Sequence, residues 1–263
     1  EQIKKFEEKK TIKLGYFETL FLVACRTFID EKLDVFIVEA GIGGRLDTTS
    51  MINYKNVILT NIGYDHQDIL GETLEDILYE KIKISNKIDN LVCGDISSEH
   101  KELISKELID TSISFLDQNN NFKSNKEDFR LKNIDLAIFS INKILGKEIK
   151  SESVAKIKEY KVQGRFEIIN SDPVKILDGA HNISGFETLF ENLDYLYKDV
   201  QFHCYLGLKE GKKFEKILDF LSEKDNIFIN IIEDNSFYSQ LNSKNLISYL
   251  EERDIDFKLS TIK

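Results

Sequence analysis

The chain has 263 residues, of which 41% are hydrophobic and 31% are charged, and its formal net charge is −10. This length allows one large or two modest domains, and the apolar content is too high for a disordered chain. The negative charge argues against a general nucleic-acid or membrane-surface binder, and no apolar run approaches the ~18 residues of a membrane helix. Three widely spaced cysteines without a CxxC pair argue against a disulfide scaffold and fit a cytoplasmic protein.

Strand-like and helix-like segments alternate along the first half of the chain. Helical spacing of apolar residues predicts helices over 15–31 and 73–87, with Thr73 as the N-cap of the second. Short apolar runs predict buried strands at 35–38, 57–62, 91–93 and 113–116. Buried strands separated by helices indicate a parallel sheet.

The second half repeats this alternation after a polar interruption. An Asn-rich loop at 117–128 precedes an amphipathic helix over 131–145 that ends at Gly146, a natural C-cap. Strands are then predicted at 166–169, 174–177, 202–206 and 227–232, and helices at 184–198, 211–223 and 243–253. The Lys/Glu-rich segment between the two halves places a domain boundary near 147–163.

Polar side chains follow two successive strands of the first half. Glu39 ends an apolar run and leads into a glycine-rich turn, and His66 comes just after the next strand. Ligands of open parallel sheets bind beyond the carboxyl ends of the strands, where a carboxylate can hold Mg²⁺. The alternatives stay open, because such a turn can be simple chain punctuation and a lone histidine is usually solvated or packed in a core.

A second cluster of polar residues opens the second half. Arg165 lies in the turn Gly-Arg-Phe-Glu, and residues 178–182 read Asp-Gly-Ala-His-Asn between a strand and a helix. A helix N-terminus and an arginine fork favour phosphate, although plain turn chemistry also explains these residue types. The sequence contains no G-x-x-x-x-G-K-[ST] phosphate loop.

Taken together, these segments resemble the folylpolyglutamate synthase/dihydrofolate synthase family, a branch of the Mur ligase superfamily. The resemblance lies in blocks that follow the family's order and spacing, at 39–49, 62–73, 79–84, 164–167 and 177–182. It implies an α/β fold with a Mur-ligase-like, mostly parallel central ATP-binding domain at 1–147. A linker at 148–163 and a smaller Rossmann-like α/β ligase domain at 164–263 would follow.

The resemblance also implies an activity and roles for individual residues. The family forms an acyl phosphate from ATP and a folate or dihydropteroate carboxylate, and L-glutamate then attacks to give an amide. By that similarity Glu39 and His66 bind Mg²⁺, Lys81 is carbamylated, and Lys81 and His181 are catalytic. ATP would contact Asn133, Arg165, Asp178 and Asn182, and the substrate loop would contain Gly43, Gly44, Arg45 and Asp47. A monovalent cation and a monomeric state are further implications.

The chain departs from the family at both ends. It lacks the family's N-terminal phosphate loop and its closing C-terminal segment, so we expect a truncated and inactive piece of a ligase. Two alternatives remain: a Mur-type ligase of peptidoglycan precursors, and a degenerate, non-catalytic binding subunit.

Overall fold

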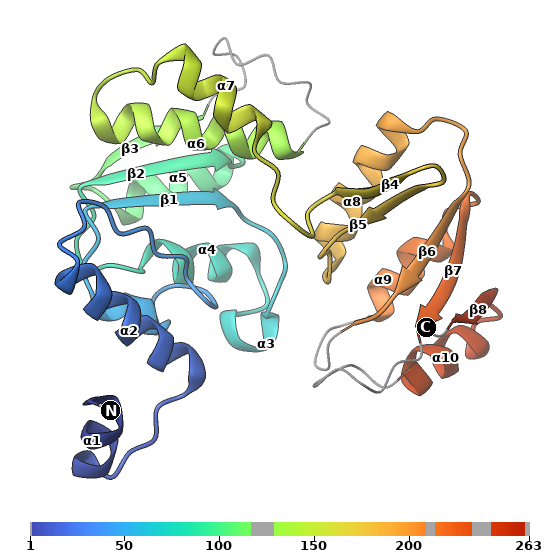
Figure 1. Cartoon of the computed structure of the whole chain (residues 1–263), viewed down its shortest axis with the longest axis horizontal. Coiled ribbons are helices and arrows are strands. Elements are labelled where there is room, and N and C mark those ends of the chain that lie inside the picture. The colour runs from blue at the N-terminus through green and yellow to red at the C-terminus, as the bar shows by residue number, and fades with distance from the viewer. Residues whose placement is uncertain (1, 117–128, 209–213, 233–242, 261–263) are drawn as a thin grey trace. The chain divides into compact units, whose positions relative to one another are not determined.

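The computed structural model describes residues 2–116, 129–208, 214–232 and 243–260 (Figure 1). The chain divides into two compact units, one of residues 1–122 and 136–149 and the other of residues 123–135 and 150–263. This division passes through helix α6 (Phe129–Leu145), so the predicted boundaries at 147 and 163 stay a prediction. No helix within the described ranges is long and apolar enough to cross a membrane. The predicted loop at 117–128 lies outside these ranges.

The first unit is built on a parallel sheet, as the sequence predicts. Its described strands pair in the order β1 (Asn56–Asn61), β2 (Asn90–Asp95) and β3 (Ser112–Phe115), with Val57 opposite Leu91 and Leu59 opposite Cys93. Its helical elements are α1 (Gln2–Lys10), α2 (Tyr16–Asp30), η1 (Thr48–Met51), α3 (Gln67–Leu70), α4 (Leu74–Ile82) and α5 (Ser98–Glu107), besides the C-terminal part of α6.

Helices cover both faces of this sheet (Figure 1). On one face Leu59, Leu91 and Cys93 pack with Leu78 and Ile82 of α4 and Ile104 of α5. On the other face α6 lies close to β2. A Cβ atom added to Gly94 of β2 would be 3.0 Å from a methyl carbon of Leu136 on α6. Cys93 is buried, and Cys25 and Cys204 are partly buried.

Local side chains decide where α4 begins and ends. The hydroxyl of Thr73 accepts the amide hydrogen of Asp76 at 3.1 Å, and the carboxylate of Asp76 accepts that of Thr73 at 3.2 Å. This capping box confirms the predicted N-cap. The helix stops at Ile82, five residues earlier than predicted, because the hydroxyl of Ser85 bonds loop backbone instead of facing a helix surface.

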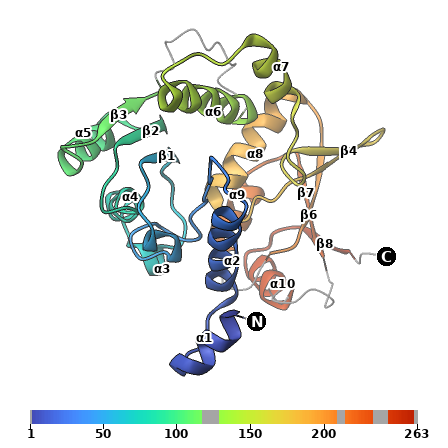
Figure 2. The ribbon, with the colours of Figure 1, turned by 60° about the vertical axis from the view of Figure 1, so that its left-hand side comes forward.

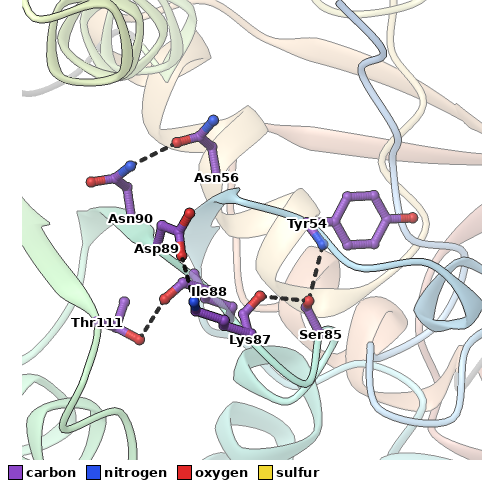
Figure 3. A network of polar contacts seen from close by, with 8 residues as sticks. All are labelled: Tyr54, Asn56, Ser85, Lys87, Ile88, Asp89, Asn90 and Thr111. Atoms are coloured by element: carbon purple, nitrogen blue, oxygen red, sulfur yellow. Dashed lines mark hydrogen bonds and ion pairs between the residues drawn. The ribbon is translucent and has the colours of Figure 1, made fainter.

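Figure 3 shows the polar network at the amino ends of the strands, where this loop is anchored. Ser85 Oγ accepts the amide hydrogen of Tyr54 at 3.0 Å and donates to the carbonyl of Lys87 at 2.9 Å. The side-chain amide of Asn90 donates to Asn56 Oδ1, and the hydroxyl of Thr111 donates to the carbonyl of Ile88, each at 2.9 Å. These bonds join the loop after α4 to the amino ends of the strands and use no residue of the candidate site.

The predicted strand at 35–38 is wrong. This segment pairs with none of the described strands, although its side chains alternate as a strand's would. Phe36 is half-buried and stacks on Phe28 of α2 with ring centroids 5.0 Å apart, whereas Ile37 is 89% exposed. The alternation of apolar side chains at 35–38 therefore reflects packing of one side of the segment against α2. It does not reflect hydrogen bonding to a neighbouring strand among those described.

The second unit contains a hairpin and a second parallel sheet (Figure 2). Strands β4 (Glu167–Ser171) and β5 (Val174–Leu177) pair antiparallel, and β6 (Phe202–Leu206), β7 (Ile227–Ile232) and β8 (Phe257–Ser260) pair parallel in that order. The helices of this unit are α7 (Ser151–Glu159), α8 (Ile183–Leu196), α9 (Glu215–Ser222) and α10 (Ser243–Glu252). The sequence did not predict β8.

One apolar cluster joins these elements. Phe190 of α8, Leu218 of α9 and Leu250 of α10 pack with Ile229 and Ile231 of the central strand β7. These side chains form the buried core of the second unit.

Candidate active site

The glycine-rich turn after Glu39 is organised by the carboxylate of Asp47. One carboxylate oxygen accepts the amide hydrogens of Gly41 at 3.1 Å and Ile42 at 3.0 Å. The other accepts the amide and the hydroxyl hydrogens of Thr49 at 2.9 Å and 2.6 Å, and Asp47 thereby caps η1. Burial tends to raise the pKa of Asp47, but these hydrogen bonds outweigh it and hold the pKa below its ordinary value.

Two glycines let the turn pack tightly against its neighbours. Gly43 has φ +69°, a conformation that side chains rarely adopt, and a Cβ atom there would lie 2.5 Å from a methyl carbon of Leu70. Gly44 is buried, and its Cβ atom would lie 2.7 Å from the carbonyl oxygen of Glu80 and 2.8 Å from that of Lys81. The turn thus packs against a side chain of α3 and against the backbone of the last turn of α4.

Arg45 extends this contact to side chains. Its amide hydrogen bonds the carbonyl of Glu80 at 2.8 Å, and its guanidinium Nη2 and Nε lie 2.6 and 2.9 Å from Glu80 Oε1. The pairing with Glu80 raises the pKa of Arg45, so the guanidinium is charged at any relevant pH.

Lys81 follows Glu80 on the same helical turn and is half-buried. Burial lowers the pKa of Lys81, and the carboxylate of Asp65 acts in the opposite direction. A buried lysine with a lowered pKa exposes more of its neutral, nucleophilic amine near neutral pH than a surface lysine does. The structure therefore brings the turn at 41–47, Asp65 and Lys81 into one cluster.

His66 enters this cluster in an unusual backbone conformation. It has φ 49° and ψ 38°, the left-handed region, directly before α3. Its ring Nε2 lies 3.8 Å from Asp65 Oδ1, and its amide hydrogen bonds the same oxygen at 2.9 Å. Non-glycine residues hold this conformation at a cost of about 1 kcal/mol or more, which is typical of functional sites.

The residues predicted to hold Mg²⁺ fit that role in chemistry. Glu39 is exposed, and no ion pair of its carboxylate is found in the described part of the chain. No group of three or more His, Cys, Asp or Glu side chains suited to a metal ion occurs among the described residues. Mg²⁺ usually keeps several waters and needs only one or two protein ligands besides substrate phosphates, so Glu39 and His66 could hold it with a nucleotide.

A second cluster forms in the other unit around Asp178. One of its carboxylate oxygens accepts the amide hydrogen of Phe166 at 2.7 Å, and the other accepts that of Ala180 at 2.8 Å. Phe166 has φ 45°, so this bond holds a residue that, like His66, is a non-glycine residue in the left-handed region. Asp178 therefore joins the turn that carries Arg165 to the turn that carries His181.

The remaining predicted residues of this unit lie in the turns next to Asp178, at the start of α8 and on α6. Arg165 is exposed, and a Cβ atom on Gly179 would lie 3.0 Å from its Nη1. His181 is exposed with Nδ1 2.9 Å from the carbonyl of Gly179. Asn182 caps α8, because its side-chain oxygen accepts the amide hydrogen of Gly185 at 2.8 Å. Asn133 lies on the exposed side of α6, and its role at a nucleotide stays a prediction.

Sequence reasoning missed two residues that hold the first cluster together. Neither Glu80 nor Asp65 is among the site residues that the sequence predicts. The signal for Glu80 was its place immediately before Lys81, together with an arginine in a glycine-rich turn that needs a carboxylate partner. For Asp65 the only signal was its position next to His66.

The parallel sheets and these two clusters define an α/β protein with charged turns at helix and strand ends. Residues 12–172, more than half of the chain, match the family model of the Mur ligase middle domain. The chain therefore belongs to the Mur ligase family. This confirms the resemblance that the sequence blocks indicated.

Two curated relatives show which members of the family the chain is similar to. The dihydrofolate synthase/folylpolyglutamate synthase of Buchnera aphidicola subsp. Schizaphis graminum is 30% identical over 238 residues, covering 83% of this chain and 57% of the relative. The Escherichia coli protein of the same name is 28% identical and covers 80% and 54%. The chain thus spans little more than half the length of these curated relatives.

Solved structures share the fold. The folylpolyglutamate synthase of Mycobacterium tuberculosis complexed with ADP and AMPPCP superposes with a TM-score of 0.80 at 24% identity, covering 97% of this chain and 65% of that one. Escherichia coli FolC in complex with DHPP and ADP gives 0.78 at 22% identity, covering 96% and 63%. The predicted α/β, mostly parallel architecture is confirmed.

Proposed function

We propose that the full-length protein is an ATP-dependent ligase that joins L-glutamate to the carboxylate of a folate or of dihydropteroate through an acyl phosphate. The observation that carries this proposal is the similarity to dihydrofolate synthase/folylpolyglutamate synthases over 83% of the chain. The membership of the Mur ligase family supports it.

Each cluster would contribute residues that bind Mg²⁺ or ATP in this reaction. Glu39 and His66 would hold Mg²⁺, which neutralises phosphate charge and orients the transferred group when it is bound. Arg165 offers a fork for phosphate oxygens, and Asn133, Asp178 and Asn182 would position the rest of the nucleotide. The imidazole of His181, which is exposed, would lie beside the γ-phosphoryl group that is transferred.

Lys81 would contribute as a carbamate. Burial lowers its pKa and raises the share of neutral amine, the form that attacks carbon dioxide. The product carries a negative charge in place of a positive one, which suits a neighbour of a metal ion. A monovalent cation could occupy the same region. We further propose a cytoplasmic monomer whose partners are small molecules and not nucleic acids.

The test is a ligation assay with the purified full-length protein. ATP, Mg²⁺ and labelled glutamate are supplied with dihydropteroate, a reduced folate or a UDP-linked muropeptide, and labelled product and ADP are measured together. We expect product with one or both pteridines. Glu39→Gln should abolish turnover, and Glu31→Gln at the exposed end of α2 is the matched control. Product from the muropeptide alone, or no product, contradicts the proposal.

A second arm uses residues 1–263 alone. This sequence contains no phosphate loop, so the β- and γ-phosphates lack their usual backbone cradle. We expect no ligation from this polypeptide, and turnover comparable to that of a full-length relative would contradict this expectation.

A further inference from the structure

We propose that Arg45 and Glu80 are positioning residues that hold the glycine-rich turn after Glu39 in register with the helical turn that carries Lys81. The pair would act through the backbone of both segments and would not contact substrate. This inference rests on the proposed function for its kinetic consequences, but the contact itself can be tested without it.

The backbones of the two segments meet directly. The amide hydrogen of Arg45 bonds the carbonyl of Glu80 at 2.8 Å. Gly44 approaches so closely that an added Cβ atom would be 2.7 Å from the Glu80 carbonyl oxygen and 2.8 Å from that of Lys81. Real Cβ atoms do not tolerate backbone oxygens at this distance, so the approach excludes any side chain at position 44 unless the segments separate.

The side chains of Arg45 and Glu80 add a second contact between the two segments. Arg45 Nη2 and Nε share one carboxylate oxygen of Glu80 at 2.6 and 2.9 Å, and the guanidinium carbon lies 6.0 Å from the ring centre of Tyr79. The Glu80 side chain is only 12% exposed, whereas that of Arg45 is 46% exposed. Removal of Arg45 would leave a largely buried carboxylate without its cation, which is more costly than loss of a surface pair.

The register matters because two candidate groups depend on it. Glu39 lies two residues before Gly41, where the hydrogen bonds of Asp47 begin, and Lys81 directly follows Glu80. A misplacement of about 1 Å between catalytic groups can reduce a rate by about 100-fold. A device that fixes both segments to each other would therefore protect the geometry of the site.

The experiment is a double-mutant cycle in the full-length protein. Arg45→Gln, Glu80→Gln and the double variant are compared with the charge exchange Arg45→Glu/Glu80→Arg and with Arg45→Lys. The matched control is Arg26→Gln/Asp30→Asn, since Arg26 and Asp30 form an exposed pair of similar length, 2.7 Å, on α2. Circular dichroism and urea unfolding establish that each variant is folded.

We expect each single variant to lower kcat by about 10- to 100-fold with KM for ATP and for the pteridine unchanged within about 3-fold. The double variant should be no worse than the singles, the exchange should recover part of kcat, and the control pair should match wild type. If Arg45 instead bound substrate directly, its replacement would raise KM and the effects of the two single variants would be independent. If Arg45→Gln raises KM, Glu80→Gln does not, and their effects multiply, the positioning role is refuted.

A second readout separates this inference from the proposed function. Hydrogen exchange at the amide of Arg45 reports the bond to the Glu80 carbonyl without any turnover. Arg45→Lys should keep that amide protected, and Glu80→Gln should speed its exchange by about 10-fold or more, as expected for loss of about 1.4 kcal/mol. If wild type makes no product, the proposed function fails alone; if exchange does not change in Glu80→Gln, the positioning role fails alone.

Discussion

The carboxylate of Asp47 offers the sharpest test of the turn after Glu39, because its four hydrogen-bond donors differ in burial. Thr49 is 1% exposed, so its amide and hydroxyl hydrogens have no water to replace a lost acceptor. Each such orphaned group costs about 1–3 kcal/mol. Gly41 and Ile42 are exposed, and their amides can bond water instead. With two such groups on Thr49, Asp47→Ala should therefore destabilise the turn by about 2–6 kcal/mol.

Asp47→Asn should cost less, because its amide oxygen can still accept from Thr49 while only the exposed amides lose their acceptor. We expect about 1 kcal/mol at pH 7. The pKa of Asp47 is lowered in the folded state, so its ionised form stabilises the fold above the ordinary pKa of about 3.9, and that stability disappears as the pH falls through the folded pKa. The difference between wild type and Asp47→Asn should therefore be complete at pH 7 and shrink below about pH 4.

The assay is urea unfolding followed by far-ultraviolet circular dichroism, with hydrogen exchange of the segment 41–49 as a local measure. Asp30→Asn is the matched control, since Asp30 is exposed and its pair with Arg26 should be worth less than about 1 kcal/mol. If Asp47→Ala unfolds within about 0.5 kcal/mol of wild type and the segment exchanges no faster, the hydrogen bonds described for Asp47 do not organise the turn.

Three further outcomes follow from single residues. His66→Gly should raise stability by about 1 kcal/mol in thermal unfolding, since glycine adopts φ 49° freely, while ligation is lost; a lower melting temperature would contradict the backbone argument. Asp178→Ala should cost about 2 kcal/mol and speed exchange at Phe166 and Ala180, and unchanged exchange would refute its role in joining the two turns. Burial raises the pKa of Cys93 to about 12, so its thiol should resist iodoacetamide at pH 8 until urea is added, and its contribution to stability should decline as the pH rises above the ordinary pKa toward 12.

Much of the fold followed from hydrophobic pattern alone. The segments predicted at 57–62, 91–93 and 113–116 coincide with β1, β2 and β3, because each is a short apolar run that lies in a covered sheet. The same pattern at 35–38 did not give a strand, since a ladder needs a partner and none of the described strands supplies one. β8 was missed because Phe257–Ser260 is too short and mixed to give a period.

Residue types located the candidate site, but they did not show its internal contacts. The sequence placed Glu39 and His66 after strand-like segments and grouped Arg165 with Asp178, and the structure shows that Asp178 bridges the two turns of its cluster. It could not show that Arg45 would be engaged by Glu80, which lies 35 residues away. Contacts of this kind depend on how a turn packs on a distant helix. The spacing of apolar residues predicts helices and strands, but it does not predict such packing.

The placement of the first apolar cluster has a consequence during protein synthesis. Its buried members all lie between Leu59 and Ile104, one short stretch of sequence, whereas those of the second cluster lie between Phe186 and Leu250. Domains generally fold as units in the order in which they leave the ribosome. All residues of the first cluster are therefore synthesised before any of the second, and the first cluster can close while the residues of the second are still untranslated.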